Sequence, residues 1–226
     1  MFEYNFNFAL IWRHFWARLG WGLVLSLELA LFSILIGMVI GLALALAFTD
    51  RGRPTRAAVA AYVEFIRNVP LLLLVYLVFY GLPSVGGFAY DATTSFIITL
   101  SLYAGAQLVE VFRAGFDAVP KGLIDAGKAI GLTPWQILVH VRLPTVFRIT
   151  LPSLGNAYIS LFKDTSLATV IAVPELTYGA NWINFNTFRI LEVYAVVAPM
   201  YMVTGWIILL ALRFLERQFA THAHAR

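Results

Sequence analysis

Apolar side chains follow one another along this chain in five long runs, each separated from the next by a polar segment. The first run, residues 21–48, reaches roughly 42 Å at a helical rise of ~1.5 Å per residue. Because the hydrocarbon core of a bilayer is about 30 Å thick, such a run can cross it with some tilt. We expect four more spanning helices, at about residues 56–82, 93–119, 146–173 and 195–215.

The polar segments differ in character. Pro70 predicts a kink inside the second helix. Residues 120–145 are the longest polar stretch, where short helices with turns are expected, and residues 174–194 read as a polar, aromatic-rich connection. The start of the chain mixes Trp and Tyr with Arg, which is typical of an interfacial segment on the periplasmic side. The predicted organisation is therefore an interfacial segment, one transmembrane domain and a cytoplasmic tail, at residues 1–20, 21–217 and 218–226.

The composition supports a chain that faces lipid. Of its 226 residues, 61% are hydrophobic and 12% are charged, whereas a soluble domain usually carries about 25% charged residues. That leaves too little polar surface to cover a water-facing globule. The expected fold class is all-α integral membrane, with five transmembrane helices. The chain has no cysteine, which excludes disulfides and thiolate metal sites.

The basic residues divide unevenly between the two sides of the membrane. Eleven lie on the side of the 120–145 connection and three on the other side. Because basic residues accumulate in cytoplasmic loops, this predicts a cytoplasmic connection, a periplasmic N-terminus and a cytoplasmic C-terminus. The two groups are Arg51, Arg53, Arg56, Arg113, Lys121, Lys128, Arg142, Arg148, Arg213, Arg217 and Arg226, against Arg13, Arg18 and Arg189.

A spaced motif occupies the 120–145 connection. Asp125 opens the run DAGKAIG, nine residues follow, and VRLP then ends at Pro144. This resembles the E-A-A-x3-G-x9-I-x-L-P signature of the permease subunits of ATP-binding-cassette (ABC) importers, with Asp125, Gly127 and Val141 as departures. The glycine at 127 should weaken the first short helix by up to ~1 kcal/mol relative to alanine.

The local chemistry predicts how this motif folds. Asp125 is expected near the start of the first short helix, where it would complement the helix dipole. Gly131 is expected to end that helix in a left-handed cap, and Thr133-Pro134 to start the next. Pro144 is expected to break the chain before the fourth span.

The resemblance implies that this connection, here named the coupling loop (residues 120–145), docks on a cytoplasmic ATPase subunit and transmits its closure. The nucleotide, ATP with Mg²⁺, would be bound by that partner, so this chain is expected to bind no cofactor and no metal and to be no enzyme. The candidate coupling residues are Asp125, Ala126, Gly127, Ala129, Gly131, Val141, Leu143 and Pro144.

Further segments resemble the histidine/glutamine/glutamate-type branch of this family, the polar amino acid permeases. They occur in the order expected for that branch and read RNVP at 67–70, AQLVEVFR at 106–113, LP at 143–144 and 151–152, KDTSL at 163–167 and PEL at 174–176. The resemblance implies a type I importer permease of the bacterial inner membrane. It also implies a second permease subunit, identical or paralogous, a periplasmic amino-acid-binding protein and an amino-acid substrate.

Ionisable side chains inside the predicted spans are candidates for the translocation path, because each costs at least ~2.5–3.5 kcal/mol at the bilayer centre. Glu64 with Arg67, and Glu110 with Arg113, are spaced so that each pair could equally neutralise itself and fix helix packing. Glu28, on the outer side of the first helix, could snorkel, pack or bind. The candidate path residues are Glu64, Arg67, Glu110, Arg113, Lys163, Asp164, Thr165 and Ser166.

Other functions receive less support from the residues. The segment 122–129 resembles a phosphate-binding loop but has Ala129 where a hydroxyl is needed. No nucleophile–base arrangement is visible, which leaves a membrane-embedded enzyme without positive support. An ATP-independent secondary transporter of small polar solutes stays as the alternative, although no internal repeat of the expected kind is found.

Overall fold

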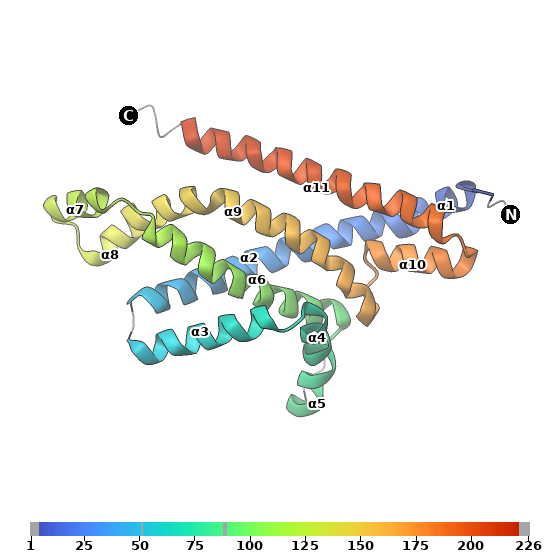
Figure 1. Ribbon diagram of the computed structural model, residues 1–226, viewed down its shortest axis with the longest axis horizontal. Coiled ribbons are helices and arrows are strands. Elements are labelled where there is room, and N and C mark those ends of the chain that lie inside the picture. The colour runs from blue at the N-terminus through green and yellow to red at the C-terminus, as the bar shows by residue number, and fades with distance from the viewer. Residues whose placement is uncertain (1–4, 51, 88–89, 222–226) are drawn as a thin grey trace.

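A computed structural model gives the fold and describes residues 5–50, 52–87 and 90–221. Within these ranges every regular element is a helix (Figure 1). Arg51, Arg226, the histidines at 222 and 224 and the end of the predicted tail lie outside the described residues. In chain order the elements are α1 (Ala9–His14), η1 (Phe15–Gly20), α2 (Trp21–Asp50), α3 (Arg53–Asn68), α4 (Leu71–Tyr76), η2 (Leu77–Gly81), α5 (Leu82–Gly86), α6 (Ala92–Asp117), α7 (Lys121–Ala129), α8 (Pro134–Ile137), η3 (Leu138–Arg142), α9 (Leu143–Asp164), η4 (Thr165–Ile171), α10 (Leu176–Thr187) and α11 (Ile190–Thr221).

Four of the helical segments are long and apolar enough to cross a membrane: Ala9–Thr49, Ala92–Asp117, Pro134–Ile171 and Ile190–Phe214. A fifth span is obtained when Arg53–Asn68 and Leu71–Gly86 are counted together, although the two are bent by 107°. The all-α membrane fold is therefore confirmed. The expected kink at Pro70 is in fact a near right-angle turn, because Val69 and Pro70 both leave the helical conformation.

Two predicted boundaries differ from the structure. α1 and η1 run directly into α2, so the first helix starts well before residue 21. The predicted connection 174–194 contains α10 and the start of α11.

The chain break expected at Pro144 is absent. α8, η3 and α9 follow one another without interruption, and η3 is a wider, π-helical segment.

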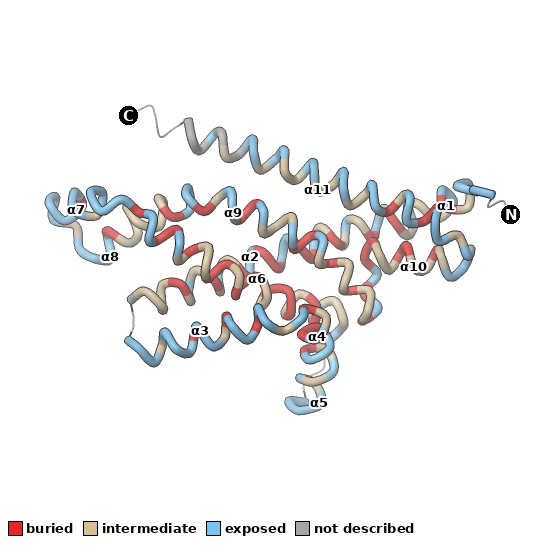
Figure 2. Tube along the Cα trace, viewed as in Figure 1, coloured by how far each residue is buried: buried red, intermediate tan, exposed pale blue. Residues whose placement is uncertain are grey.

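The centre of the bundle is the contact between α2 and α6 (Figure 2). Gly37 and Gly41 of α2 face α6, where an added Cβ would lie 2.6 Å from the Cβ of Ala104 and 2.7 Å from that of Leu108. In the same interface, Gly105 of α6 lies directly against Ile40 of α2. These small residues permit a close approach of the two helices. The buried aromatic rings of Phe96 and Phe112 complete the core with α9.

The remaining helices surround this centre. The coupling loop, with α7 and α8, lies at one end of the bundle, and α1, α10 and the start of α11 lie at the other (Figure 1). α4 and α5 project sideways as an arm beyond the bend (Figure 1). α11 packs on α9 and α10 along one side but leaves most of its length exposed.

Candidate coupling loop and translocation path

The coupling loop is held by local hydrogen bonds at each turn. Gly131 has a φ of +82° and ends α7. Its N–H donates to the Lys128 carbonyl at 3.0 Å, and the Leu132 N–H donates to the Gly127 carbonyl at 3.1 Å. This is the two-bond cap that a glycine in the left-handed region makes possible, so the predicted role of Gly131 as a helix terminator is confirmed.

The second helix of the loop begins as predicted. Thr133 caps α8, because its Oγ1 accepts from the Gln136 N–H at 3.3 Å while Gln136 Oε1 accepts from the Thr133 N–H at 2.8 Å. Pro134 occupies the first turn. The loop therefore has a defined shape without contributions from the rest of the bundle at these turns.

Gly127 and Asp125 have roles that their sequence positions did not reveal. Gly127 is buried, and a Cβ there would lie 3.3 Å from Cγ1 of Ile137, so the glycine permits close packing of α7 on α8. Asp125 is the fifth residue of α7, so the expected dipole contact at the helix start is wrong. Its Oδ1 pairs instead with Nζ of Lys128 at 3.2 Å on the exposed face.

The exposed surface of the loop carries large apolar side chains. Ile130 is 77% exposed and Trp135 is 70% exposed, and Leu123 on α7 is also exposed. Leu123 and Ile130 lie outside the four long apolar segments, and Trp135 is the second residue of the segment Pro134–Ile171. Three exposed apolar side chains of this size therefore lie on or beside the short helices α7 and α8.

The predicted charge pairs have different outcomes. Arg113 Nη1 binds Glu110 Oε1 at 2.8 Å, and its guanidinium also stacks 3.9 Å from the centre of the Phe48 ring. The structure therefore pairs these two charges with each other on α6 and fixes them against α2. In the described residues no ion pair joins Glu64 to Arg67, and Glu64 Oε2 accepts instead from the Asn68 side chain at 3.0 Å.

Glu64 and Arg67 both lie on the exposed side of α3, immediately before the bend. Lys163 and Asp164 end α9, where the helix tightens into the 3₁₀ segment η4. Thr165 is buried and its hydroxyl donates to the Phe162 carbonyl at 2.7 Å, whereas Lys163 is exposed and Ser166 is half-buried. Because η4 packs on α4, this cluster lies next to the arm that follows α3.

A buried carboxylate that sequence reasoning missed holds the opposite end together. Glu175 is fully buried and caps α10, where Oε2 accepts from the Thr177 N–H and Oε1 from the Tyr178 N–H, both at 2.8 Å. Oε2 also lies 3.1 Å from the Tyr201 hydroxyl on α11 and 3.3 Å from the Ser26 hydroxyl on α2. These five residues are named the Glu175 cluster.

The Glu175 cluster joins three helices through one side chain. Burial raises the pKa of Glu175 to about 7, although the four hydrogen bonds favour the charged form. The only hint in the sequence was an acidic residue directly after Pro174, which suits a helix start.

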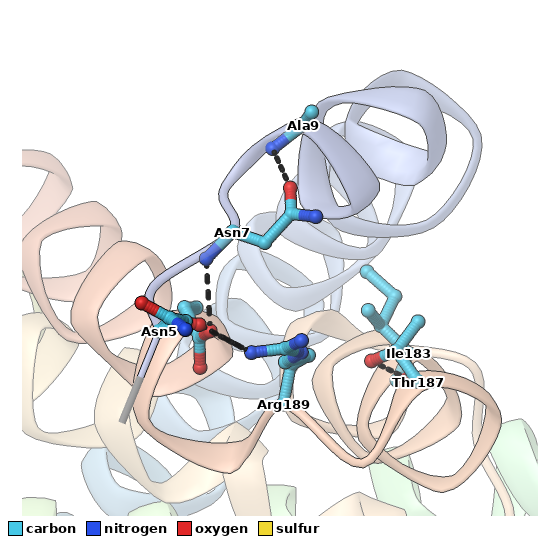
Figure 3. Close-up of polar contacts among 7 residues, drawn as sticks. Asn5, Asn7, Ala9, Ile183, Thr187 and Arg189 are labelled. Carbon is cyan, nitrogen blue, oxygen red and sulfur yellow. Dashed lines mark hydrogen bonds and ion pairs between the residues drawn. The ribbon is translucent and has the colours of Figure 1, made fainter. Parts of the chain in front are cut away.

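A second buried carboxylate ties the start of the chain to the turn between α10 and α11 (Figure 3). Glu192 is fully buried and accepts from Arg189 Nη1 at 3.2 Å and from the Asn7 N–H at 3.1 Å. The same Arg189 nitrogen donates to the Asn5 carbonyl at 2.6 Å. Residues before α1 are therefore fixed to the start of α11.

Backbone contacts strengthen this end further. A Cβ on Gly22 would lie 2.8 Å from the Glu175 carbonyl oxygen, and one on Gly179 would lie 2.6 Å from that of Arg18. Both glycines are buried, and they let α10 lie directly against η1 and α2. The guanidinium of Arg18 stacks over Trp182 at 3.9 Å across the same contact.

Comparisons with known proteins agree with this arrangement. The family described as binding-protein-dependent transport system inner membrane component matches residues 14–221. The L-cystine transport system permease protein TcyB of Bacillus subtilis (strain 168) is 37% identical over 210 residues, covering 92% of this chain and 89% of that protein. The glutamine transport system permease protein GlnP of Escherichia coli (strain K12) is 35% identical over 158 residues, covering 70% and 72%.

Solved structures show the same fold. The crystal structure of an amino acid ABC transporter with histidines matches with a TM-score of 0.86 at 29% identity, covering 95% of this chain and 100% of that chain. The MetNI methionine ABC transporter in its inward-facing conformation matches in fold, with a TM-score of 0.74 at 21% identity and coverage of 94% and 99%. The resemblance to ABC importer permeases is thus confirmed, and it argues against the secondary-transporter alternative. The chain belongs to the family of inner membrane components of binding-protein-dependent transport systems.

Proposed function

We propose that this chain is the membrane-spanning permease subunit of an ATP-driven importer for a polar amino acid or a close analogue. The substrate would cross the inner membrane by alternating access, driven by a separate ATPase that binds ATP and Mg²⁺. The observation that carries this proposal is the coupling loop, which has a defined local shape and exposes apolar side chains at one end of the bundle. Relatives named as cystine and glutamine permeases support the amino-acid substrate.

The coupling loop would be the ATPase contact. Ile130 and Trp135 offer apolar anchors of the kind that dominate binding at protein interfaces. The caps at Gly131 and Thr133 hold these anchors in place before the partner binds, which lowers the entropy cost of association. The proposed orientation places this end in the cytoplasm and the N-terminus in the periplasm, as the distribution of basic residues predicts.

The other partners would complete the importer. A second permease subunit, identical or paralogous, would form the path together with this chain, and a periplasmic amino-acid-binding protein would deliver the substrate at the α10 end. The exposed polar face of α3 supports a shared path, since lipid is a poor solvent for Glu64 and Arg67. These residues would face water or the second subunit.

Within the path, Lys163 and Asp164 are the charges best placed for a zwitterion. They lie where α9 changes to η4, and such changes of helix type often accompany function. A cation suits the substrate carboxylate and an anion suits its ammonium group. Glu110 and Arg113 already satisfy each other, so we assign them a packing role between α6 and α2.

Co-purification tests the coupling loop. The tagged chain is expressed in its native host, extracted gently, and its partners are identified by mass spectrometry. We expect an ATPase to accompany the wild-type chain and to be lost with Gly131→Arg. Gly87→Arg is the matched control, because Gly87 has a φ of +67° and open space around it, like Gly131, but lies at the end of α5. Retention of the ATPase by Gly131→Arg would contradict the assigned contact.

The path assignment has a separate test in reconstituted vesicles. Asp164→Asn and Glu64→Gln are expected to lower amino-acid uptake at least tenfold while the amount of inserted protein stays unchanged. Glu110→Gln is expected to reduce the unfolding temperature more than the uptake per folded molecule. Equal uptake by Asp164→Asn and the wild-type protein would remove Asp164 from the path.

A further inference from the structure

Glu28 is a carboxylate without a protein partner in the part of the chain that the structure describes. It is exposed on α2, and neither a hydrogen bond nor an ion pair is formed to it there. Glu28 precedes Thr49, in the last turn of α2, by 21 residues, which at ~1.5 Å per residue is roughly 32 Å. This separation is close to the thickness of the hydrocarbon core, about 30 Å, so with Thr49 at one headgroup level Glu28 would reach the other.

A pocket of about 320 Å³ lies beside Glu28, between the start of α2 and the start of α10. Arg18, Trp21 and Tyr178 line it together with Glu28. Gly22 and Gly179 also line the pocket, where the backbones of α2 and α10 come close together. The pocket is therefore lined by one anion, one cation and two aromatic side chains.

Below the pocket the same face of α2 is apolar and exposed. Leu31 and Leu35 are each 46% exposed, and Val39 is 70% exposed. With Glu28 they are spaced three or four residues apart and so follow one stripe of the helix. A ligand that fits both regions has a charged head with ammonium and phosphate groups and a long apolar tail.

We propose that this pocket and stripe bind a phospholipid with a primary ammonium headgroup, namely phosphatidylethanolamine. Its ammonium group would be held by Glu28 and the aromatic faces of Trp21 and Tyr178, and its phosphate would lie toward Arg18. The acyl chains would follow the stripe from Leu31 to Val39. Glu28 disfavours an anionic headgroup, and a free amino acid would leave the stripe unused.

Lipid retention tests the proposal on the full-length chain. The protein is placed in nanodiscs of equal parts phosphatidylethanolamine and phosphatidylglycerol, extracted in mild detergent, and the retained lipids are counted by native mass spectrometry. We expect the wild-type chain to prefer phosphatidylethanolamine and Glu28→Gln to lower that preference about threefold, the range of an exposed ion pair. Glu64→Gln, which removes an exposed carboxylate outside the pocket, should leave the preference unchanged.

A second variant keeps the test independent of Glu28 alone. Leu35→Gln alters the stripe without touching the pocket and should reduce the total retained lipid but leave the headgroup preference intact. Equal lipid ratios for the wild-type and Glu28→Gln chains would overturn the proposal. So would displacement of the lipid by millimolar L-glutamine or L-cystine, which would make this a site for a soluble zwitterion. Crosslinking from Trp21 to a second copy of the chain would likewise overturn it.

Discussion

Glu175 and Glu192 are fully buried at the α10 end of the bundle, whereas Asp125 and Lys128, the ion pair of the coupling loop, have 70% and 65% of their side-chain surface exposed. The α10 end also brings backbones into direct contact at its glycines, while Gly122 and Gly131 of the loop face open space. One end is therefore held by contacts between distant parts of the chain, and the other by bonds within a few residues.

This difference has an energetic meaning. A buried carboxylate with several donors is stable in one arrangement of its helices only, because each displaced donor would be left without a partner. An exposed loop with good caps keeps its own shape but contributes little to holding the bundle together. The α10 end is thus restricted to one arrangement of its helices, whereas the coupling loop keeps its shape through its own caps.

The largest effect is expected from Glu175→Ala. The substitution removes the cap of α10 and leaves the N–H groups of Thr177 and Tyr178 and the hydroxyl of Tyr201 without their acceptor. We expect a loss of about 3–5 kcal/mol in the free energy of unfolding, measured by chemical denaturation in detergent. Asp91→Ala is the control, since Asp91 caps α6 in the same manner but in solvent, and a much smaller loss is expected.

The pH dependence of stability should follow from the same carboxyl group. Because burial raises the pKa of Glu175 from 4.5 to about 7, the folded chain holds this proton more tightly than the unfolded chain does. The contribution of this proton to the free energy of unfolding is complete below about pH 4.5. It is lost as the pH rises through 7, by up to about 3 kcal/mol. Thermal unfolding of the wild-type and Glu175→Gln proteins between pH 5 and 8 measures it, and parallel curves would refute the assignment.

Gly179→Ala should reveal the difference between the two ends of the bundle through packing alone. Its Cβ would come within 2.6 Å of the Arg18 carbonyl oxygen, a backbone atom that cannot rotate away. We expect a loss of about 2–3 kcal/mol, as for other overpacked sites. Gly122→Ala in α7 meets no atom within 4 Å and should instead stabilise that helix by up to about 1 kcal/mol. Similar unfolding temperatures for the two variants would contradict the contrast between the ends.

The smallest expected loss of stability is at the two glycines with positive φ. Gly131→Ala and Gly87→Ala each place a Cβ in the left-handed region and should each cost about 1 kcal/mol. Calorimetry should therefore find the two variants alike in stability. ATP-dependent uptake should distinguish them, because only Gly131 lies in the proposed ATPase contact. Equal uptake by both variants would argue that the shape of the cap does not matter for coupling.

The parts of the fold that were predictable are those governed by local rules. The apolar runs gave the spans, because lipid requires long apolar helices. Gly131 and Thr133 were assigned correctly since capping depends on neighbours in sequence. The candidate path residues could be named by type alone, because ionisable groups are rare in spans.

The parts that were missed depend on contacts between distant residues. Glu175 accepts hydrogen bonds from Ser26 of α2 and Tyr201 of α11. Contacts between residues so far apart in the sequence leave no local sequence pattern. The fifth span was predicted to start at about residue 195, whereas α11 starts at Ile190, where Arg189 and the Asn7 backbone hydrogen-bond to Glu192. The spacing of Glu64 and Arg67 suggested an ion pair, but Asn68 lies closer to the carboxylate.

The unbroken course of α1, η1 and α2 has a mechanical consequence. The 41 residues from Ala9 to Thr49 form one rod, about 60 Å long at the usual helical rise and so about twice as long as the hydrocarbon layer is thick. One end of the rod is clamped by α10 and the other bears the Phe48 ring under Arg113. Because the helix is continuous, a tilt of a few degrees at one end would displace the opposite end by several ångströms.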